Sequence, residues 1–405
     1  MSKLYRTIAL FVIAAFITSC GGPGTLPEVS IVRHPEPANY SGFNVYTELP
    51  TFDPASTDPF QVDLRSADLA KLDLSTSKDS LIYAAFDSKT QWPTSEKMPA
   101  DFDSQKIMEI GTDPGLEMRA LHDQGITAQG VGIAIIDQTL LVDHIEYKDR
   151  IVLYEEAEDI TDGWMDAQMH GPAVASIAVG KTVGVAPKAD LYFIATAMCS
   201  QGTYESVDFA CLAKSVRRII EINEGLPSTR KIRVLSMSIG WGPQSKGYDE
   251  ISAAVNEAKA AGIFVISSSL SETHGLHFHG LGRDPLADPN TFQSYAPGLW
   301  WQQWFFDHGF SSDVLMVPMD SRTTASPTRT EDYVFYRQGG WSWSIPYLAG
   351  MYALAVQVKP DITPEEFWAT ALETGQTIQI QHDGKNYEFG VILDPQALIE
   401  AIKTR

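Results

Sequence analysis

Short, mostly apolar runs that recur between residues 131 and 266 restrict the fold more than any other feature of the sequence. Helix-length amphipathic stretches separate them, and one of these, over residues 248–261, is followed by a glycine, as helices often are. Apolar runs of this length are typical of strands covered on both faces, as in a parallel sheet. Strands that alternate with helices therefore predict a doubly wound α/β fold, with a mostly parallel β-sheet flanked by helices. The runs occupy residues 131–136, 189–194, 232–237 and 263–266.

The first residues have the pattern of an export signal. Lys3 and Arg6 precede an apolar run over residues 8–17, which is short for a membrane span. The run ends in Ile-Thr-Ser-Cys at residues 17–20, which resembles the lipobox of bacterial lipoproteins and implies cleavage before Cys20 and acylation of its thiol. The alternative is an ordinary secretory signal with an incidental cysteine. Both place the mature chain outside the cytoplasm, and the first anchors it to a bacterial membrane by lipid.

Composition divides the chain into four segments. Residues 1–19 are the predicted signal peptide, and residues 20–59, rich in Pro, Gly, Ser and Thr, predict the lipidated cysteine and a flexible tether. Residues 60–104 contain Asp-Leu pairs at five-residue intervals, which belong either to a pentapeptide-type coil or to a small cap or propeptide-like segment. We prefer the second interpretation, because three repeats are too few for a solenoid. Residues 105–405 carry the α/β pattern.

The charge of the chain argues against two classes of partner. It has 30 Lys and Arg against 51 Asp and Glu, a formal net charge of −21. Nucleic acids and anionic membranes are bound through clustered basic residues, so we expect no nucleic-acid partner and membrane attachment through lipid alone. Cys199 and Cys211 either form one disulfide or stay as free thiols, and the sequence leaves both possibilities open.

Three reactive side chains lie where an α/β sheet is expected to gather its chemistry, at the carboxyl ends of strands. Asp137 ends the first apolar run, His170 begins a run of small residues, and Ser342 follows two glycines at the start of a helical pattern. A serine at a helix N-terminus has an exposed hydroxyl, and the N–H groups there face developing negative charge. Each residue alone is commonly structural, but the order Asp, His, Ser is that of the subtilisin arrangement.

Five blocks of sequence resemble, in order and spacing, the motifs of the subtilase family of serine peptidases. The resemblance implies a subtilisin-like fold and a serine endopeptidase that needs no cofactor and cleaves extended protein or peptide substrates through an acyl-enzyme. Ser342 is then the nucleophile, His170 the general base and acid, and Asp137 the residue that orients the imidazole. The implied substrate-binding residues are Ser238, Ile239, Gly240 and Leu270, the first three pairing with the substrate as an added strand. The five blocks cover residues 130–137, 170–175, 184–191, 236–240 and 340–350.

Several positions depart from the family pattern. Ser271 stands where the family usually has an asparagine that donates a hydrogen bond to the oxyanion, so Ser271, Thr273 and His274 are the candidate replacements. Loss of one such donor typically costs about 100- to 1,000-fold in turnover. Leu270 replaces a glycine and is expected to narrow the first specificity pocket. Trp341 and Trp343 flank Ser342 in place of Thr and Met, and Gln138 and Thr139 follow the aspartate in place of a small residue and glycine.

These departures support a second hypothesis, a catalytically impaired subtilase that acts as a surface peptide-binding or sensing module. We prefer the active enzyme, because losing one triad residue removes most catalysis and this chain has all three. Ser344 is the competing nucleophile, two residues after Ser342.

Four further patterns carry weaker predictions. The aromatic stretch 300–306 forms a platform for substrate, rests on the surface of a bilayer, or packs into the core. We prefer packing into the core. His274, His277 and His279 do not have the spacing of a closed zinc site, so no metal is predicted there. The acidic stretch 155–162 lacks the ligand alternation of a calcium loop, which favours a solvated loop over a structural calcium. Asp383-Gly384 predicts a hairpin turn.

Overall fold

The computed structural model describes residues 29–40, 44–54, 56, 58, 60–161, 163–200 and 206–405. The predicted export signal and Cys20 lie outside these residues. Within the described part, no helix is both long and apolar enough to cross a membrane.

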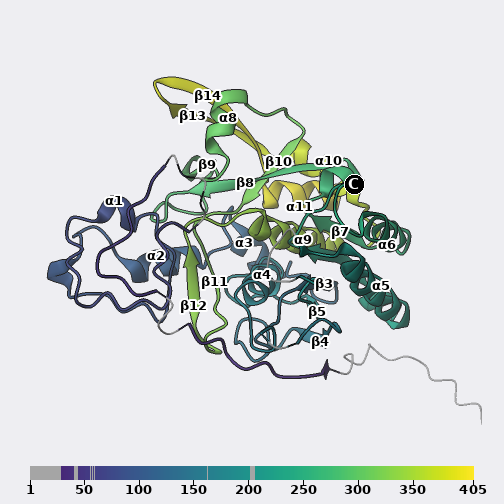
Figure 1. Ribbon diagram of the computed structural model, residues 1–405. Helices are drawn as coiled ribbons and strands as arrows, with labels where there is room; N and C mark the ends of the chain where they lie inside the picture. The colour runs from purple at the N-terminus through teal and green to yellow at the C-terminus, as the bar shows by residue number, and fades with distance from the viewer. Residues whose placement is uncertain are drawn as a thin grey trace, which may run out of the picture.

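A six-stranded parallel sheet forms the centre of the molecule, in the order β1-β4-β5-β3-β6-β7 (Figure 1). Every residue of β3 and β5 is buried, as expected for strands covered on both faces. Alternate residues of β3 belong to two different cores, because successive side chains of a strand point to opposite faces: Ile133 and Ile135 to one, Ala134 and Ile136 to the other. The six strands are β1 (Ser30–Ile31), β3 (Gly132–Asp137), β4 (Ile151–Glu156), β5 (Asp190–Ala195), β6 (Ile232–Met237) and β7 (Phe264–Ser267).

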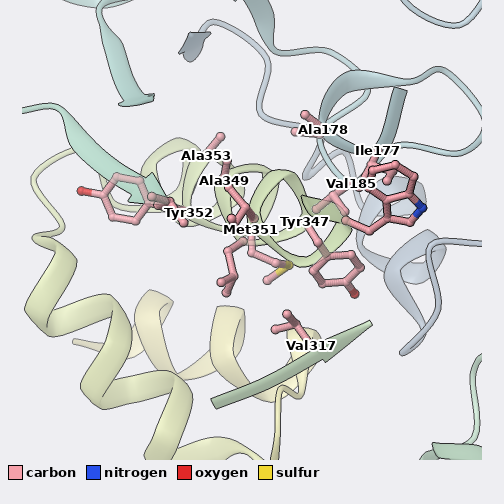
Figure 2. Close-up of a cluster of buried hydrophobic side chains, with 14 of the residues drawn as sticks. Ile177, Ala178, Val185, Val317, Tyr347, Ala349, Met351, Tyr352 and Ala353 are labelled. Atoms are coloured by element: carbon pink, nitrogen blue, oxygen red, sulfur yellow. The ribbon is translucent and has the colours of Figure 1, made fainter. Parts of the chain in front are cut away.

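Helices cover both faces of this sheet, which confirms the predicted α/β fold. On one face lie α4 (His170–Val179) and α9 (Trp341–Val358), and on the other α5 (Phe209–Gly225) and α6 (Tyr248–Ala260). Helix α9 is buried on all sides from Trp343 to Val356, and Figure 2 shows its side chains between residues from α4 and the segment after it and a residue from a second sheet. Tight packing around α9 fixes the position of its first turn, where Ser342 lies.

A second sheet, in the order β13-β14-β10-β8-β9, packs on the outer side of α9. Asp383 and Gly384 both have positive φ, 48° and 72°, and join β13 to the antiparallel β14, so the predicted hairpin turn is confirmed. This sheet and its helices comprise α7 (Leu270–His274), β8 (His277–Arg283), η4 (Phe292–Ser294), β9 (Tyr295–Pro297), α8 (Gln302–His308), β10 (Val314–Pro318), α10 (Pro364–Thr374), β13 (Gln376–His382), β14 (Lys385–Ile392) and α11 (Pro395–Thr404).

Residues 60–104 form a small cap with its own apolar core. The leucines of the three Asp-Leu repeats are buried, and the N–H groups of Leu64, Leu69 and Leu74 donate to a second stretch of the cap, at the carbonyls of Ala85, Gln91 and Lys97. The cap core also contains Ile107 and Phe335, so it extends past the predicted boundary at residue 104. Its elements and those that join it to the body are α1 (Lys78–Leu81), β2 (Phe86–Asp87), η1 (Ser95–Lys97), α2 (Ser104–Gly111), α3 (Met118–Asp123), β11 (Arg322–Ala325) and β12 (Tyr333–Tyr336). The short helix η3 (Ser228–Arg230) lies between α5 and β6 of the body.

The predicted tether over residues 20–59 is wrong for its described part. Ser30 and Ile31 pair in parallel with β4 as the edge strand of the central sheet, and the Arg33 guanidinium donates two hydrogen bonds to the Glu156 carboxylate, at 3.0 and 2.6 Å. Further along, the Phe52 ring stacks on Tyr83 with centroids 3.6 Å apart. A two-residue strand is too short to produce any hydrophobic period, so composition alone suggested a tether.

The acidic stretch is a solvated loop only in part, since Glu158 is exposed but Glu155 and Glu156 belong to β4. Glu155 pairs with Arg218 at 2.8 Å, and Asp159 accepts hydrogen bonds from Thr196 and from the backbone of Cys199. Cys199 and Cys211 form a disulfide that joins the loop after β5 to α5. In the described residues no group of three or more His, Cys, Asp or Glu is arranged to hold a metal ion.

Candidate active site

The end of β3 and the start of α4 bring Asp137 and His170 together. His170 Nδ1 lies 2.7 Å from Asp137 Oδ1, and this oxygen also accepts the backbone N–H of Gln138 at 2.7 Å. The Asp137 side chain is fully buried, whereas that of His170 is 18% exposed. The bond at Nδ1 leaves Nε2 as the ring nitrogen that can take a proton from a hydroxyl.

Gly171 allows this close approach. A Cβ at this position would lie 2.2 Å from the backbone carbonyl oxygen of Gln138. Because that oxygen belongs to the residue after Asp137, any side chain here would push α4 away from the carboxylate. The glycine of the His170-Gly171 pair is therefore a packing requirement of the site.

The charge of Asp137 controls the protonation of His170. Burial lowers the pKa of His170. The negative charge of Asp137 and the hydrogen bond to it together raise the pKa by more than burial lowers it, so the pKa of His170 lies above its ordinary value. A carboxylate that holds the imidazole at Nδ1 also stabilises the imidazolium that forms when Nε2 takes a proton.

Ser342 lies in the first turn of α9 and is held against the chain that follows β6. Its Oγ donates to the Ser238 carbonyl at 3.4 Å, and Ser238 Oγ donates to the Ser342 carbonyl at 3.0 Å. Gly340 precedes this turn with a φ of 91°, a conformation that favours glycine.

Ser342 and His170 line one cavity of about 600 Å³, and Asp137 lies behind the imidazole. No hydrogen bond joins Ser342 Oγ to His170 within the described residues. Such bonds are often long in enzymes without substrate and tighten when substrate binds. The structure thus gathers the three residues predicted from the sequence, with the serine hydroxyl turned toward Ser238.

The predicted substrate strand also borders this cavity, with one qualification. Ser238, Ile239 and Gly240 all line it, but the Ile239 N–H donates to the Met237 carbonyl and the Ile239 carbonyl accepts from Ser268, at 2.8 and 3.0 Å. Because both backbone groups of Ile239 are already used, pairing with a substrate is not expected at this residue.

The predicted oxyanion donors need correction, because none of Ser271, Thr273 and His274 lines the cavity. Ser271 Oγ donates to Glu272 at 2.7 Å, Thr273 Oγ1 donates to the Ser269 carbonyl at 3.0 Å, and the His274 ring packs edge-on against Phe264. Helix α7 begins at Leu270, shortly after β7, and carries these side chains away from the cavity.

Leu270 needs the same correction. It is fully buried in the main core and does not line the cavity, so it does not narrow the pocket directly. Ser344, the competing nucleophile, is fully buried and its Oγ donates to the Pro318 carbonyl at 3.5 Å.

Two residues that line the cavity were not predicted from the sequence to belong to the site. Gln138 lines the cavity, and its Oε1 accepts the backbone N–H of His170 at 3.4 Å, which places a side-chain amide beside the first residue of α4. Glu272 brings an exposed carboxylate to the same cavity. The unusual residue after Asp137 was a signal for Gln138, but nothing in the sequence distinguished Glu272 from a surface glutamate.

The tryptophans on either side of Ser342 lie in different surroundings. Trp343 is buried and packs against the His170 ring with centroids 5.3 Å apart. Trp341 lines the cavity, and its Nε1 donates to His279 Nδ1 at 3.3 Å. One tryptophan thus supports the imidazole, and the other forms part of the cavity wall.

Comparison with known proteins places these features in context. A model of the Subtilase family matches residues 128–302. The chain is 25% identical over 264 residues to the subtilisin-like proteinase Spm1 of Pyricularia oryzae, covering 61% of this chain and 46% of that protein. It is 25% identical over 282 residues to the serine protease AprX of Bacillus subtilis, covering 60% and 61% of the two chains. The chain thus spans less than two thirds of the length of these relatives.

A likeness to a solved structure supports the fold. A protease from Pseudoalteromonas arctica PAMC 21717 superposes with a TM-score of 0.50 and 21% sequence identity, covering 72% of this chain and 95% of that one. At this identity the likeness bears on the fold alone.

Proposed function

This chain belongs to the subtilase family, and on that premise we propose that it is a serine endopeptidase that hydrolyses extended protein substrates outside the cytoplasm. The observation that carries the proposal is the 2.7 Å contact between Asp137 and His170 beside a cavity that Ser342 also lines. Cleavage begins when Ser342 Oγ attacks the substrate carbonyl and His170 Nε2 takes the hydroxyl proton. His170 then gives this proton to the leaving amine, and an acyl-enzyme remains. Water, deprotonated by His170, hydrolyses the ester and restores Ser342.

Active-site labelling tests the nucleophile directly. A fluorophosphonate probe is expected to label the wild-type chain and the Ser344→Ala variant, and not the Ser342→Ala variant, because Ser342 lines one cavity with His170 whereas Ser344 is fully buried. Gel fluorescence after labelling measures this. Labelling that persists in Ser342→Ala and disappears in Ser344→Ala would reassign the nucleophile.

One observation favours a second candidate, an impaired subtilase that binds peptides without cleaving them. The side chains expected to donate to the oxyanion lie on α7 outside the cavity, and Ser342 Oγ is bonded to Ser238. Absence of labelling in the wild type, together with binding of extended peptides, would support this candidate over the enzyme.

We also propose that Cys20 is acylated and holds the protein at a bacterial membrane. The proposal rests on the lipobox-like residues 17–20 and on the net charge of −21, which disfavours electrostatic attraction to anionic lipid. Replacing Cys20 with Ala is expected to move the chain from the membrane fraction to the soluble fraction and to remove labelling by an alkyne fatty acid. A wild-type chain that is already soluble and unlabelled would indicate an ordinary secretory signal.

A further inference from the structure

The cavity wall beside Ser342 continues into a connected group of aromatic rings, which we name the aromatic shelf: Trp341, His279, Trp300, Phe310 and Trp304. The Trp341 ring lies 5.4 Å from Trp300 and 5.1 Å from His279, measured between centroids. Phe310 lies 4.7 Å from His279 and 4.9 Å from Trp304, which extends the group outward. The rings therefore run without a break from the residue next to the proposed nucleophile to the protein surface.

The outer rings of the shelf are exposed, whereas their neighbours in sequence are not. Trp300 and Trp304 are 46% and 48% exposed. Trp301 and Phe305 are 3% and 2% exposed and pack into the main core. The preferred expectation of core packing thus holds for Trp301 and Phe305, whereas Trp300 and Trp304 are presented to solvent. Aromatic side chains of this size usually bury most of their surface, so their exposure calls for a ligand.

Directed contacts hold the shelf rigidly. Trp341 Nε1 donates to His279 Nδ1, and Trp300 Nε1 points inward to Met319 Sδ at 3.4 Å. The Asp320 carboxylate accepts the N–H of Gly339, three residues before Ser342, and the N–H of Leu299, next to Trp300, both at 2.8 Å. One buried side chain therefore fixes both the nucleophile loop and the aromatic segment, so little ordering entropy is lost when a ligand binds.

We propose that the aromatic shelf is a substrate subsite that takes an aromatic or large apolar side chain of the peptide, a few residues from the bond that is cleaved. The proposal rests on the proposed peptidase function. Trp341 borders Ser342, and Trp300 is one ring further out. An extended peptide advances about 3.3 Å per residue, and every second side chain points to the same side. The side chain that lies over Trp300 is therefore within about three residues of the scissile bond.

Two observations favour a substrate segment over a bilayer as the occupant. The shelf is continuous with the cavity that holds Ser342 and His170, through Trp341, which belongs to both. The polar edge of Trp300 is turned inward to Met319, so its ring forms a wall and not a wedge that projects into lipid headgroups. Aromatic rings in such a wall favour offset or edge-on contact with another aromatic ring.

Peptide binding to the full-length, uncleaving Ser342→Ala chain tests the subsite separately from catalysis. Peptides of one extended sequence carry Phe or Gly at each position in turn, and calorimetry measures their Kd. We expect Phe at one position to bind about tenfold more tightly than Gly, and the added change Trp300→Ala to reduce that ratio to about one. Trp300→Phe, which keeps a ring, should restore most of the preference, and Met165→Ala, at an exposed position outside the cavity, should leave it unchanged.

Two results would overturn the subsite. One is a Phe preference that survives Trp300→Ala, or no preference at any position. The other is binding of the Ser342→Ala chain to phosphatidylcholine vesicles that depends on Trp300 and occurs without a peptide preference, which would indicate a bilayer contact. Failure of the proposed function shows differently, as a wild-type chain that the fluorophosphonate does not label.

Discussion

Replacing Asp137 with Asn is expected to lower the turnover of peptide substrates about 10⁴-fold while the fold persists. Asparagine has nearly the same shape, but it does not hold His170 in the tautomer that leaves Nε2 free to accept a proton, and it carries no charge to stabilise the imidazolium. Steady-state rates with a chromogenic peptide measure the loss. Asp149→Asn, which removes one charge from an exposed position, is the matched control and should keep its activity.

The same variant should shift the pH dependence. In the wild type the pKa of His170 lies above its ordinary value because Asp137 outweighs the effect of burial, and only the neutral imidazole accepts a proton. Activity should therefore rise with pH through a pKa above about 6.5, and in Asp137→Asn the midpoint should fall below it, since burial then dominates. The stability that this ion pair provides has the opposite dependence: it is complete below the unfolded pKa and is lost as pH rises through the folded one. Identical pH–rate profiles for the two proteins would exclude this role of Asp137.

A chain that begins at residue 105 is not expected to accumulate as a folded protein. Removing the cap takes β2 away from β12 and exposes Phe335, whose ring lies 5.2 Å from Phe86 between centroids. Each large apolar side chain that loses its buried surroundings costs about 1.5–3 kcal/mol, and several such losses exceed the 5–15 kcal/mol by which typical domains are stable. Circular dichroism and thermal melting of the purified chain measure the result.

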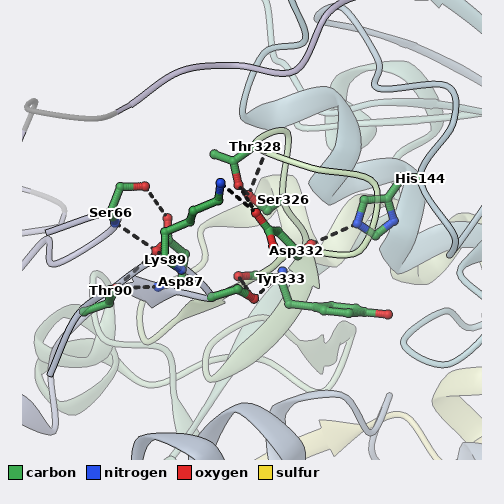
Figure 3. Close-up of polar contacts among 10 residues, drawn as sticks. Ser66, Asp87, Lys89, Thr90, His144, Ser326, Thr328, Asp332 and Tyr333 are labelled. Atoms are coloured by element: carbon green, nitrogen blue, oxygen red, sulfur yellow. Dashed lines mark hydrogen bonds and ion pairs between the residues drawn. The ribbon is translucent and has the colours of Figure 1, made fainter.

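Polar contacts between cap and body add to this loss (Figure 3). Lys89 forms an ion pair with Asp332 at 3.5 Å, and the Tyr333 N–H donates to Ser88 Oγ at 2.8 Å. The buried guanidinium of Arg337 donates to the Ile82 carbonyl of the cap at 3.1 Å and would lose this acceptor. Unpaired buried charge is strongly destabilising.

Two controls separate a requirement for the cap from a general failure to fold. A chain that begins at residue 29 keeps β1 and the cap and should melt as the full chain does. Phe86→Ala keeps the cap but removes its central ring, and should cost about 3–5 kcal/mol in the free energy of unfolding. A chain from residue 105 that melts cooperatively near the full-length temperature would restore the propeptide interpretation. The cap does not line the cavity, so its excision would not open the site.

The sequence predicted those parts of the fold whose signal is local and continuous. The strands β3 and β5 are buried on both faces, so their apolar runs are unbroken and easily found. The residues of the proposed triad were equally accessible, because Asp137, His170 and Ser342 each lie at or next to the end of an element and carry short motifs around them. Residues that the site needs for close packing, such as Gly171, are next in sequence to the residues proposed to react, such as His170.

Features that depend on partners far along the chain could not be predicted in this way. The β1 strand exists only because β4, more than a hundred residues later, offers an open edge. The oxyanion candidates Ser271, Thr273 and His274 lie outside the cavity because the chain forms α7 there, and Leu270, the first residue of α7, faces the core. The aromatic shelf joins Trp341 to Trp300 through space. From the sequence they were seen only as two unrelated features, a departure from the family pattern at Trp341 and an aromatic stretch that begins at Trp300.

Pairing of Ser30 with β4 also limits how far the folded body can lie from Cys20. Only ten positions separate Cys20 from Ser30, and a chain of that length reaches at most about 36 Å even when fully stretched. If Cys20 is acylated as proposed, the folded body would stay within this distance of the bilayer surface. Substrates in solution would then have to diffuse to the membrane to be cleaved.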